Sequence, residues 1–112
     1  MTGIPKTMTA IAITEPGAAD VLKPIELATP EPGPNDILVK VEAAGINRPD
    51  VLQRMGGYPP PPGAPETPGL EIAGTVAALG ANAGKWQIGD RVCALVAGGG
   101  YAEYCCVDET NA

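Results

Sequence analysis

The stretch GINRPDVLQRMGGYPPPPG, residues 45–63, sets polar side chains between glycines and four consecutive prolines. Pro49 suits the first position of a helix, Asp50 suits its positive end, and Gly56 and Gly57 end it. The spacing therefore predicts a helix of about two turns with an apolar side and a polar side. Its polar side is expected to face something other than the core.

The segments around this stretch predict strands and no long helix. Apolar and polar residues alternate most clearly over residues 36–47, where Ile37, Val39 and Val41 share one face. Shorter patterns predict further strands at 8–15, 25–28, 69–80, 90–97 and 101–109. Many short strands with glycine and proline between them favour a mainly β fold, a small and partly open β-barrel with short helices.

Length and composition exclude several classes of protein. The 112 residues suit one domain, and the net charge of -6 is opposite to that of a nucleic-acid binder. No apolar run could span a bilayer, and residues 1–17 lack the apolar centre of a secretory signal. Three cysteines, with Cys105 next to Cys106, are a poor disulfide framework. We therefore expect a cytoplasmic protein with no nucleic-acid or membrane partner.

Several catalytic motifs are absent from the sequence. The chain has no histidine, which removes Ser–His and Cys–His nucleophilic pairs and every histidine metal ligand. If Cys105 and Cys106 share a strand, their thiols point to opposite faces, which disfavours a zinc site. GANAGKW, residues 80–86, lacks the spacing and the Ser or Thr of a phosphate loop and is expected to form a turn. No glycine-rich dinucleotide fingerprint lies between a strand and a long helix.

Four motifs resemble, in order and spacing, the N-terminal GroES-like half of the medium-chain dehydrogenase/reductase superfamily. They are GINRPDVLQRMGGY (45–58), PGLEIAGTV (68–76), IGDRV (88–92) and GGGYAEY (98–104). Asn47, Asp50 and the tail RMGGYPPPPG further resemble the zinc-free quinone oxidoreductases, especially the group that includes the p53-inducible quinone oxidoreductase. The resemblance covers residues 8–112 and implies an incomplete GroES-like catalytic domain without its Rossmann half. Residues 1–7 are expected to be a ragged or vector-derived start.

The resemblance also bears on zinc. Zinc-dependent alcohol dehydrogenases of the superfamily carry a cysteine ligand near position 47, where this chain has none. They carry a Gly-His-Glu motif where it has Gly69, Leu70 and Glu71. No four-cysteine lobe follows Val92, so the resemblance implies neither catalytic nor structural zinc.

By this resemblance the chain would take part in hydride transfer from NADPH or NADH to a quinone or another conjugated carbonyl compound, within a homodimer. Asn47 would bind the nicotinamide carboxamide or the acceptor carbonyl, and Tyr58 would donate to an acceptor oxygen on which negative charge grows. Asp50 would orient Asn47 or Arg54, and Gln53 could reach the cleft if the helix rotates that way. The catalytic candidates are thus Asn47, Tyr58 and Asp50, and the cofactor-binding candidates are Asn47, Gln53 and Tyr58.

Structural roles compete with these assignments. Asp50 could simply stabilise the helix N-terminus, and Tyr58 could be a packed aromatic side chain at the rim. Arg54 is expected to be solvated or ion-paired, and Glu71 is expected to pair with an arginine.

Two other functions fit the sequence. An enoyl-reductase domain of a polyketide or fatty-acid synthase shares the fold and lacks zinc. A free-standing GroES-like binding or co-chaperonin module belongs to a different class, and its mark would be a ring-shaped oligomer. Under the enzyme interpretation the chain alone is expected to be inactive, because a pyrophosphate needs a glycine-rich loop and a helix N-terminus that this sequence lacks.

Overall fold

The computed structural model describes residues 3–112, so the expected irregular start at residues 1–7 falls partly outside it. Its strands are β1 Thr7–Ile13, β2 Leu22–Ala28, β3 Asp36–Ala44, β4 Glu71–Leu79, β5 Arg91–Leu95 and β6 Tyr104–Asp108. The helix α1 spans Arg48–Arg54, and single 3-10 turns cover Ala19–Val21 and Glu109–Asn111. The predicted mainly β fold with short helices is confirmed.

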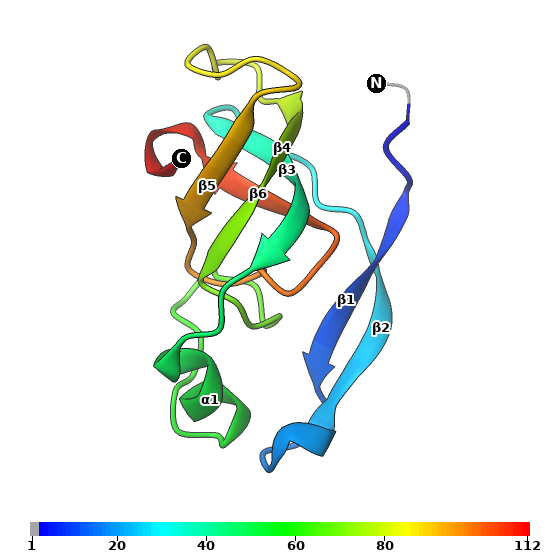
Figure 1. Cartoon of the computed structure of the whole chain (residues 1–112), viewed down its shortest axis with the longest axis vertical. Coiled ribbons are helices and arrows are strands. Elements are labelled where there is room, and N and C mark those ends of the chain that lie inside the picture. Colours follow the sequence, from blue (N-terminus) through cyan, green and yellow to red (C-terminus); the bar gives the residue numbers. More distant parts are fainter. Residues whose placement is uncertain (1–2) are drawn as a thin grey trace.

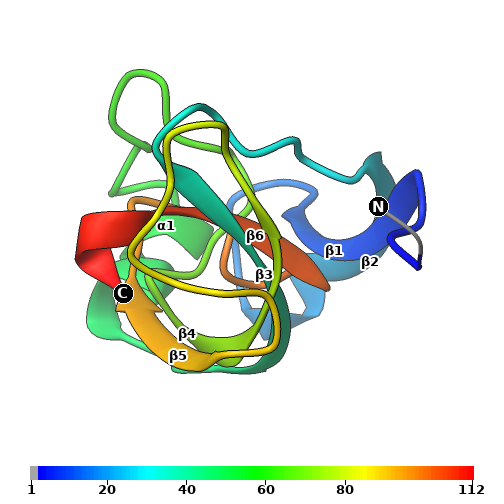
Figure 2. The same ribbon diagram turned by 90° about the horizontal axis from the view of Figure 1, so that it is seen from above.

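The strands form two antiparallel sheets that do not close into a barrel. One sheet has the order β5-β4-β3-β6, and the hairpin β1-β2 stands to one side of it (Figure 1). The view from above shows the same separation (Figure 2). A bridge between Ala10 and Ala102 and the bond from Ile11 N to Tyr101 O, 2.9 Å, join the hairpin to the loop before β6. This open arrangement of short strands agrees with the partly open β fold that the sequence predicted.

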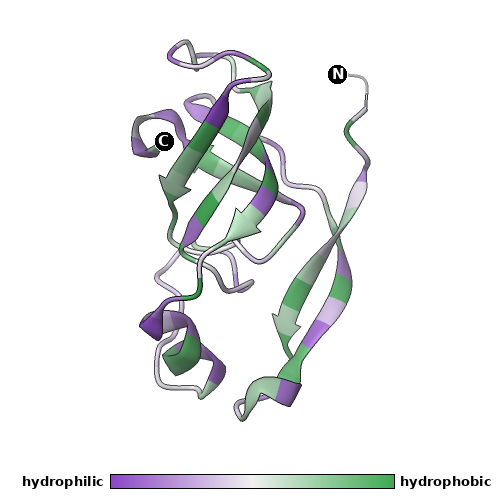
Figure 3. Cartoon of the chain, in the orientation of Figure 1, coloured by the Kyte–Doolittle hydropathy of each residue, from purple (hydrophilic) through white to green (hydrophobic). Residues whose placement is uncertain are grey.

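One face of the four-stranded sheet is buried along its length, and the other face is buried only in part, where β1 packs against it. One core cluster includes Ile37, Val39 and Cys105, and a second includes Leu38 with residues of β1 and β6. Cys106 packs against the second cluster, so the two adjacent thiols lie on opposite faces, as predicted. Apolar residues accordingly follow the strands of the sheet (Figure 3). Burial of each large aliphatic side chain stabilises such a core by about 1.5–3 kcal/mol.

Some predicted boundaries are wrong by a few residues. The strand expected over 36–47 ends at Ala44, because the chain leaves β4 after the bond from Gly45 N to Glu71 O, 3.0 Å. Asn47 is then extended and becomes the N-cap of α1, so the helix begins at Arg48 rather than Pro49. Alternation cannot separate a strand from the extended residues that follow it.

The strand expected over 101–109 begins at Tyr104, because residues 98–101 cross the segment before β4. Gly99 N donates to Thr67 O at 2.7 Å, and Tyr101 N donates to Pro68 O at 2.9 Å. Gly69 has φ 108°, and a Cβ on it would lie 2.6 Å from Tyr101 N. The two glycine-rich motifs are therefore packed backbone against backbone, and this crossing brings Tyr101 within hydrogen-bond reach of α1.

Candidate functional site

Helix α1 has seven residues, too few to be stable in water by propensity alone. At its start, Asn47 and Asp50 form a capping box. Asn47 N donates to Asp50 Oδ2 at 3.0 Å, and Asp50 N donates to Asn47 O at 3.0 Å. These bonds satisfy amides that the first turn of a helix leaves without partners. The two residues are thus joined at the helix start, and Asp50 makes the contact expected of a residue that stabilises a helix N-terminus.

Asp50 is a buried carboxylate, 5% exposed, that also contacts the loop before β6. The Tyr101 hydroxyl donates to Asp50 Oδ2 at 2.7 Å, while Oδ1 is buried and accepts no hydrogen bond from residues 3–112. Burial raises the pKa of Tyr101 well above its usual range, and the hydrogen bond to Asp50 and its charge add to the rise. Tyr101 therefore stays a neutral donor.

Sequence reasoning missed Tyr101 as part of the site. The motif GGGYAEY was noted for its resemblance alone. Its three glycines were a usable signal, because a glycine run next to a tyrosine allows the backbone to approach another segment closely.

The Asn47 side chain is held by β4. Asn47 Nδ2 donates to Glu71 Oε1 at 2.9 Å. Glu71 can lie there because Gly45 has no side chain, since a Cβ on Gly45 would be 2.6 Å from Glu71 Oε1. The expected pairing of Glu71 with an arginine is wrong, and Glu71 orients the candidate carboxamide instead.

The rest of α1 is tied to two loops. Gln53 Nε2 donates to Glu66 O at 3.0 Å, which joins the helix to the proline-rich segment. Arg54 Nε donates to Gly17 O, and Gly17 N donates to Arg54 O, both at 3.0 Å. Arg54 is half-buried and forms no ion pair within residues 3–112, and its Nε is bound to the turn after β1.

Tyr58 lies after the helix, before the prolines, and is 38% exposed. Its hydroxyl makes no hydrogen bond with the residues that the structure describes. Ile46, before the helix, is 81% exposed. We call Asn47, Asp50, Gln53, Tyr58, Glu71 and Tyr101 the α1 corner. Within it, Tyr58 presents a free donor, and Asn47 presents an amide of fixed orientation.

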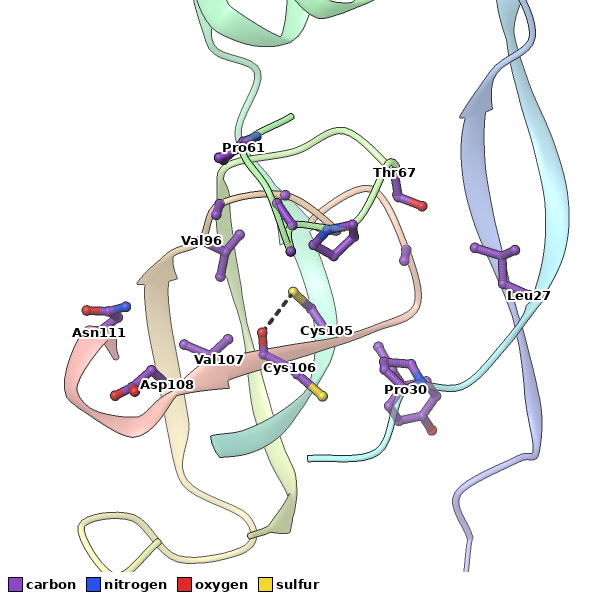
Figure 4. A pocket seen from close by; sticks show the side chains of 18 of the residues that line it. Leu27, Pro30, Pro61, Thr67, Val96, Cys105, Cys106, Val107, Asp108 and Asn111 are labelled. Carbon is purple, nitrogen blue, oxygen red and sulfur yellow. Dashed lines mark hydrogen bonds between the residues drawn. The ribbon is translucent and has the colours of Figure 1, made fainter. Parts of the chain in front are cut away.

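A cavity of about 630 Å³ lies between the hairpin, the proline-rich segment and β6 (Figure 4). Leu27, Pro30 and Val96 are among its lining residues, together with Cys105 and Cys106. None of the predicted site residues lines it. Burial raises the pKa of Cys105 to about 12 and that of Cys106 to about 11, so neither thiol is a nucleophile near neutral pH.

The donor set of the domain does not suit a metal ion. Residues 3–112 contain no group of three His, Cys, Asp or Glu side chains that could hold one. None of the helices described has the length and apolar character to cross a membrane.

Residues 33–112 match the model of the alcohol dehydrogenase GroES-like domain. The chain belongs to this family. The match contains the whole α1 corner, together with β3 to β6. The corner is thus a feature of a GroES-like domain rather than of an added segment.

Two proteins named quinone oxidoreductases are similar to this chain. The chain is 41% identical over 101 residues to the quinone oxidoreductase of Homo sapiens, a match that covers 88% of this chain and 31% of the relative. The structure of the quinone oxidoreductase from Coxiella burnetii is similar with a TM-score of 0.85 and 32% identity, over 95% of this chain and 36% of that one. The predicted resemblance to the quinone oxidoreductases is confirmed.

A mycobacterial protein solved in complex with NADPH is also similar. Its TM-score is 0.78 at 37% identity, over 93% of this GroES-like chain and 31% of that one. The chain spans about a third of the length of these relatives.

Proposed function

We propose that the chain is the catalytic domain, residues 8–112, of a zinc-independent and cytoplasmic NAD(P)H:quinone oxidoreductase that works as a homodimer. Its acceptors are quinones or other conjugated carbonyl compounds. The similarity to proteins named quinone oxidoreductases supports the reaction class, and the similarity to a protein complexed with NADPH supports the cofactor. The observation that carries the proposal is the Asn47 carboxamide, which donates to Glu71 near the position where zinc enzymes of the superfamily carry a cysteine ligand.

Asn47 orients a reacting partner in this proposal. Its side chain donates to Glu71 at 2.9 Å through an exposed contact, which favours one orientation of the amide. The amide can bind a nicotinamide carboxamide or the acceptor carbonyl. Asp50 acts indirectly, because its carboxylate is buried and its bonds go to Asn47 N and Tyr101.

Tyr58 is the proposed donor to the acceptor. Its hydroxyl is free to bind a quinone oxygen, where negative charge grows as the hydride arrives. Gln53 is bound to Glu66 O through an exposed contact, and its side chain can exchange that contact for a ligand. When bound, the cofactor supplies the hydride. The quinone also takes a proton from solvent, and the products are the hydroquinone and the oxidised nicotinamide.

The described residues fit one end of the cofactor. The α1 corner offers amide and hydroxyl groups that suit a nicotinamide, and Asp50 Oδ1 is a buried acceptor without a partner among residues 3–112. No glycine-rich phosphate loop is present in the sequence, and a net charge of -6 repels an anionic cofactor. We therefore expect the chain alone neither to bind NADPH at micromolar concentration nor to reduce quinones.

Zinc independence has its own test. Asn47 and Leu70 replace the side chains that ligate catalytic zinc in the superfamily's alcohol dehydrogenases. Elemental analysis of the chelator-washed protein, expressed from the whole gene, is expected to find no stoichiometric zinc. Zinc that survives the wash would contradict this part of the proposal.

The main test compares two asparagines in the protein expressed from the whole gene. Asn47→Ala is expected to lower kcat/KM for NAD(P)H-dependent quinone reduction by about 2–4 kcal/mol, roughly 30- to 1,000-fold. Asn82→Ala is the matched control, since Asn82 is exposed and lies in the turn after β4. Equal activity of Asn47→Ala and the parent would remove Asn47 from the site. Turnover of enoyl thioesters but not quinones would favour the enoyl-reductase alternative.

A further inference from the structure

We propose that Tyr101 is a positioning residue that acts through Asp50 to hold Asn47 at the start of α1. The geometry concerns this chain's own residues, and its consequence for catalysis rests on the proposed function. Tyr101 itself is not expected to touch the substrate.

Two hydrogen bonds connect Tyr101, Asp50 and Asn47 through one shared atom, Asp50 Oδ2. Asp50 Oδ2 accepts from the Tyr101 hydroxyl at 2.7 Å and from Asn47 N at 3.0 Å. Asp50 Oδ1 receives no hydrogen bond from residues 3–112. The carboxylate is therefore oriented by these two donors, and one of them is Tyr101. Because Asp50 is 5% exposed, water cannot readily take the place of a lost donor.

Tyr101 is a firm support because its own backbone is fixed on two sides. Its N–H donates to Pro68 O at 2.9 Å, before β4, and its carbonyl accepts from Ile11 N at 2.9 Å, in β1. Gly69 lets the two segments cross so closely that a Cβ there would lie 2.6 Å from Tyr101 N. The hydroxyl thus connects α1, which is too short to be stable by itself, to a loop that the sheet and the hairpin hold in place.

Loss of the hydroxyl is expected to loosen the helix start. Tyr101→Phe keeps the ring and removes the donor, which leaves the buried carboxylate with Asn47 N as its hydrogen-bond partner among the described residues. Hydrogen bonds to charged groups are stronger than neutral ones, so this loss is larger than that of an ordinary hydroxyl contact. Asp50 then becomes free to rotate, and Asn47 N exchanges more readily with solvent.

Tyr104 provides a matched control. It is a buried tyrosine, whereas Tyr101 is half-buried; it begins β6, and its hydroxyl makes no hydrogen bond with residues 3–112. Tyr104→Phe therefore removes the same atom without touching Asp50.

The first experiment measures hydrogen–deuterium exchange at single amides in the protein expressed from the whole gene. Tyr101→Phe is expected to speed exchange at Asn47 N by about tenfold, with little change at Val76 N in β4. Tyr104→Phe is expected to leave Asn47 unchanged. Equal exchange at Asn47 in Tyr101→Phe and the parent, or equal acceleration at Asn47 and Val76, would overturn the proposal.

The second experiment measures quinone reduction by the same proteins. Tyr101→Phe is expected to lower kcat about tenfold while KM for the nucleotide stays the same, because positioning acts on the transition state. In an Asp50→Ala background the same change is expected to have no further effect. Independent, multiplicative losses would refute action through Asp50. An inactive parent would refute the proposed function, and the exchange result would still decide whether Tyr101 holds Asn47.

Discussion

Gly69→Ala tests whether the crossing of the two glycine-rich segments supports the domain. Gly69 has φ 108°, a region that costs a residue with a side chain about 1–2 kcal/mol. The new Cβ would also lie 2.6 Å from Tyr101 N and 2.7 Å from Gly100 Cα. These are backbone atoms, so a flexible side chain cannot relieve the contact by moving away.

The magnitude combines two losses and one gain. Overpacking a tight contact costs about 1–3 kcal/mol, and alanine returns about 0.4–1 kcal/mol by restricting the unfolded chain. With the cost of the positive φ, the net loss is about 2–4 kcal/mol. Because a domain is stable by about 5–15 kcal/mol, this one methyl group removes a large share of the total.

The assay follows the opening of β4 with urea in the protein expressed from the whole gene. Exchange of Val76 N, measured at increasing urea, gives the free energy of unfolding of the domain. Gly63→Ala is the control, because Gly63 also has a positive φ, 84°, but a Cβ there meets nothing within 4 Å. Its net cost is expected to be about 1 kcal/mol.

The difference between the two variants isolates the crossing, and we expect it to be about 2 kcal/mol. A difference below about 0.5 kcal/mol would show that the segments separate without cost and would refute this reasoning. The support ascribed to Tyr101 would then also fail, since that residue is held by the same crossing.

Two further predictions concern the α1 corner and the thiols. Gly45→Ala should displace the Glu71 side chain and release the Asn47 amide, which lowers kcat/KM severalfold. The free energy of unfolding should change by less than about 1 kcal/mol, because the flexible end of Glu71 can move away from the new methyl group. Unchanged kinetics would contradict the role of Glu71. Iodoacetamide at about pH 8, without urea, should modify the exposed Cys93 and leave Cys105 and Cys106 in β6 intact, because burial raises the pKa of both thiols. Peptide mass mapping measures the modification. Modified Cys105 or Cys106 in the folded protein would contradict this prediction.

Local patterns were enough to predict the strands and the helix. Alternation over 36–44, Pro49 near the helix start and Gly56 after its end are signals within a few residues of each other. They placed the elements and erred at ends where extended residues follow a strand. The opposite faces of the two adjacent thiols also followed from the period of a strand.

The contacts of the candidate site could not be predicted in this way. Tyr101 and Asp50 are 51 residues apart, and Asn47 and Glu71 are 24 apart. Each pair depends on how β4, β6 and α1 are packed, and no periodicity within one element reports on that. The predicted site therefore contains Asp50 without Tyr101, and the sequence predicts an arginine rather than Asn47 as the partner of Glu71.

The polar side chains of residues 45–63 therefore have two different roles, since some hold the helix in place and others remain for a ligand. Most of them already bond to this chain: Asp50 to Tyr101, Gln53 to Glu66 O and Arg54 to Gly17 O. A seven-residue helix between a strand end and a proline-rich loop needs such ties, because it cannot hold its place by propensity. The groups left for a ligand are then few, chiefly the Tyr58 hydroxyl and the carboxamide of Asn47. A polar side chain in this motif is thus more informative about function the fewer bonds it makes within the domain, and on that criterion Tyr58 ranks above Asn47, Arg54 and Asp50, whose side chains each bond to another segment of the chain.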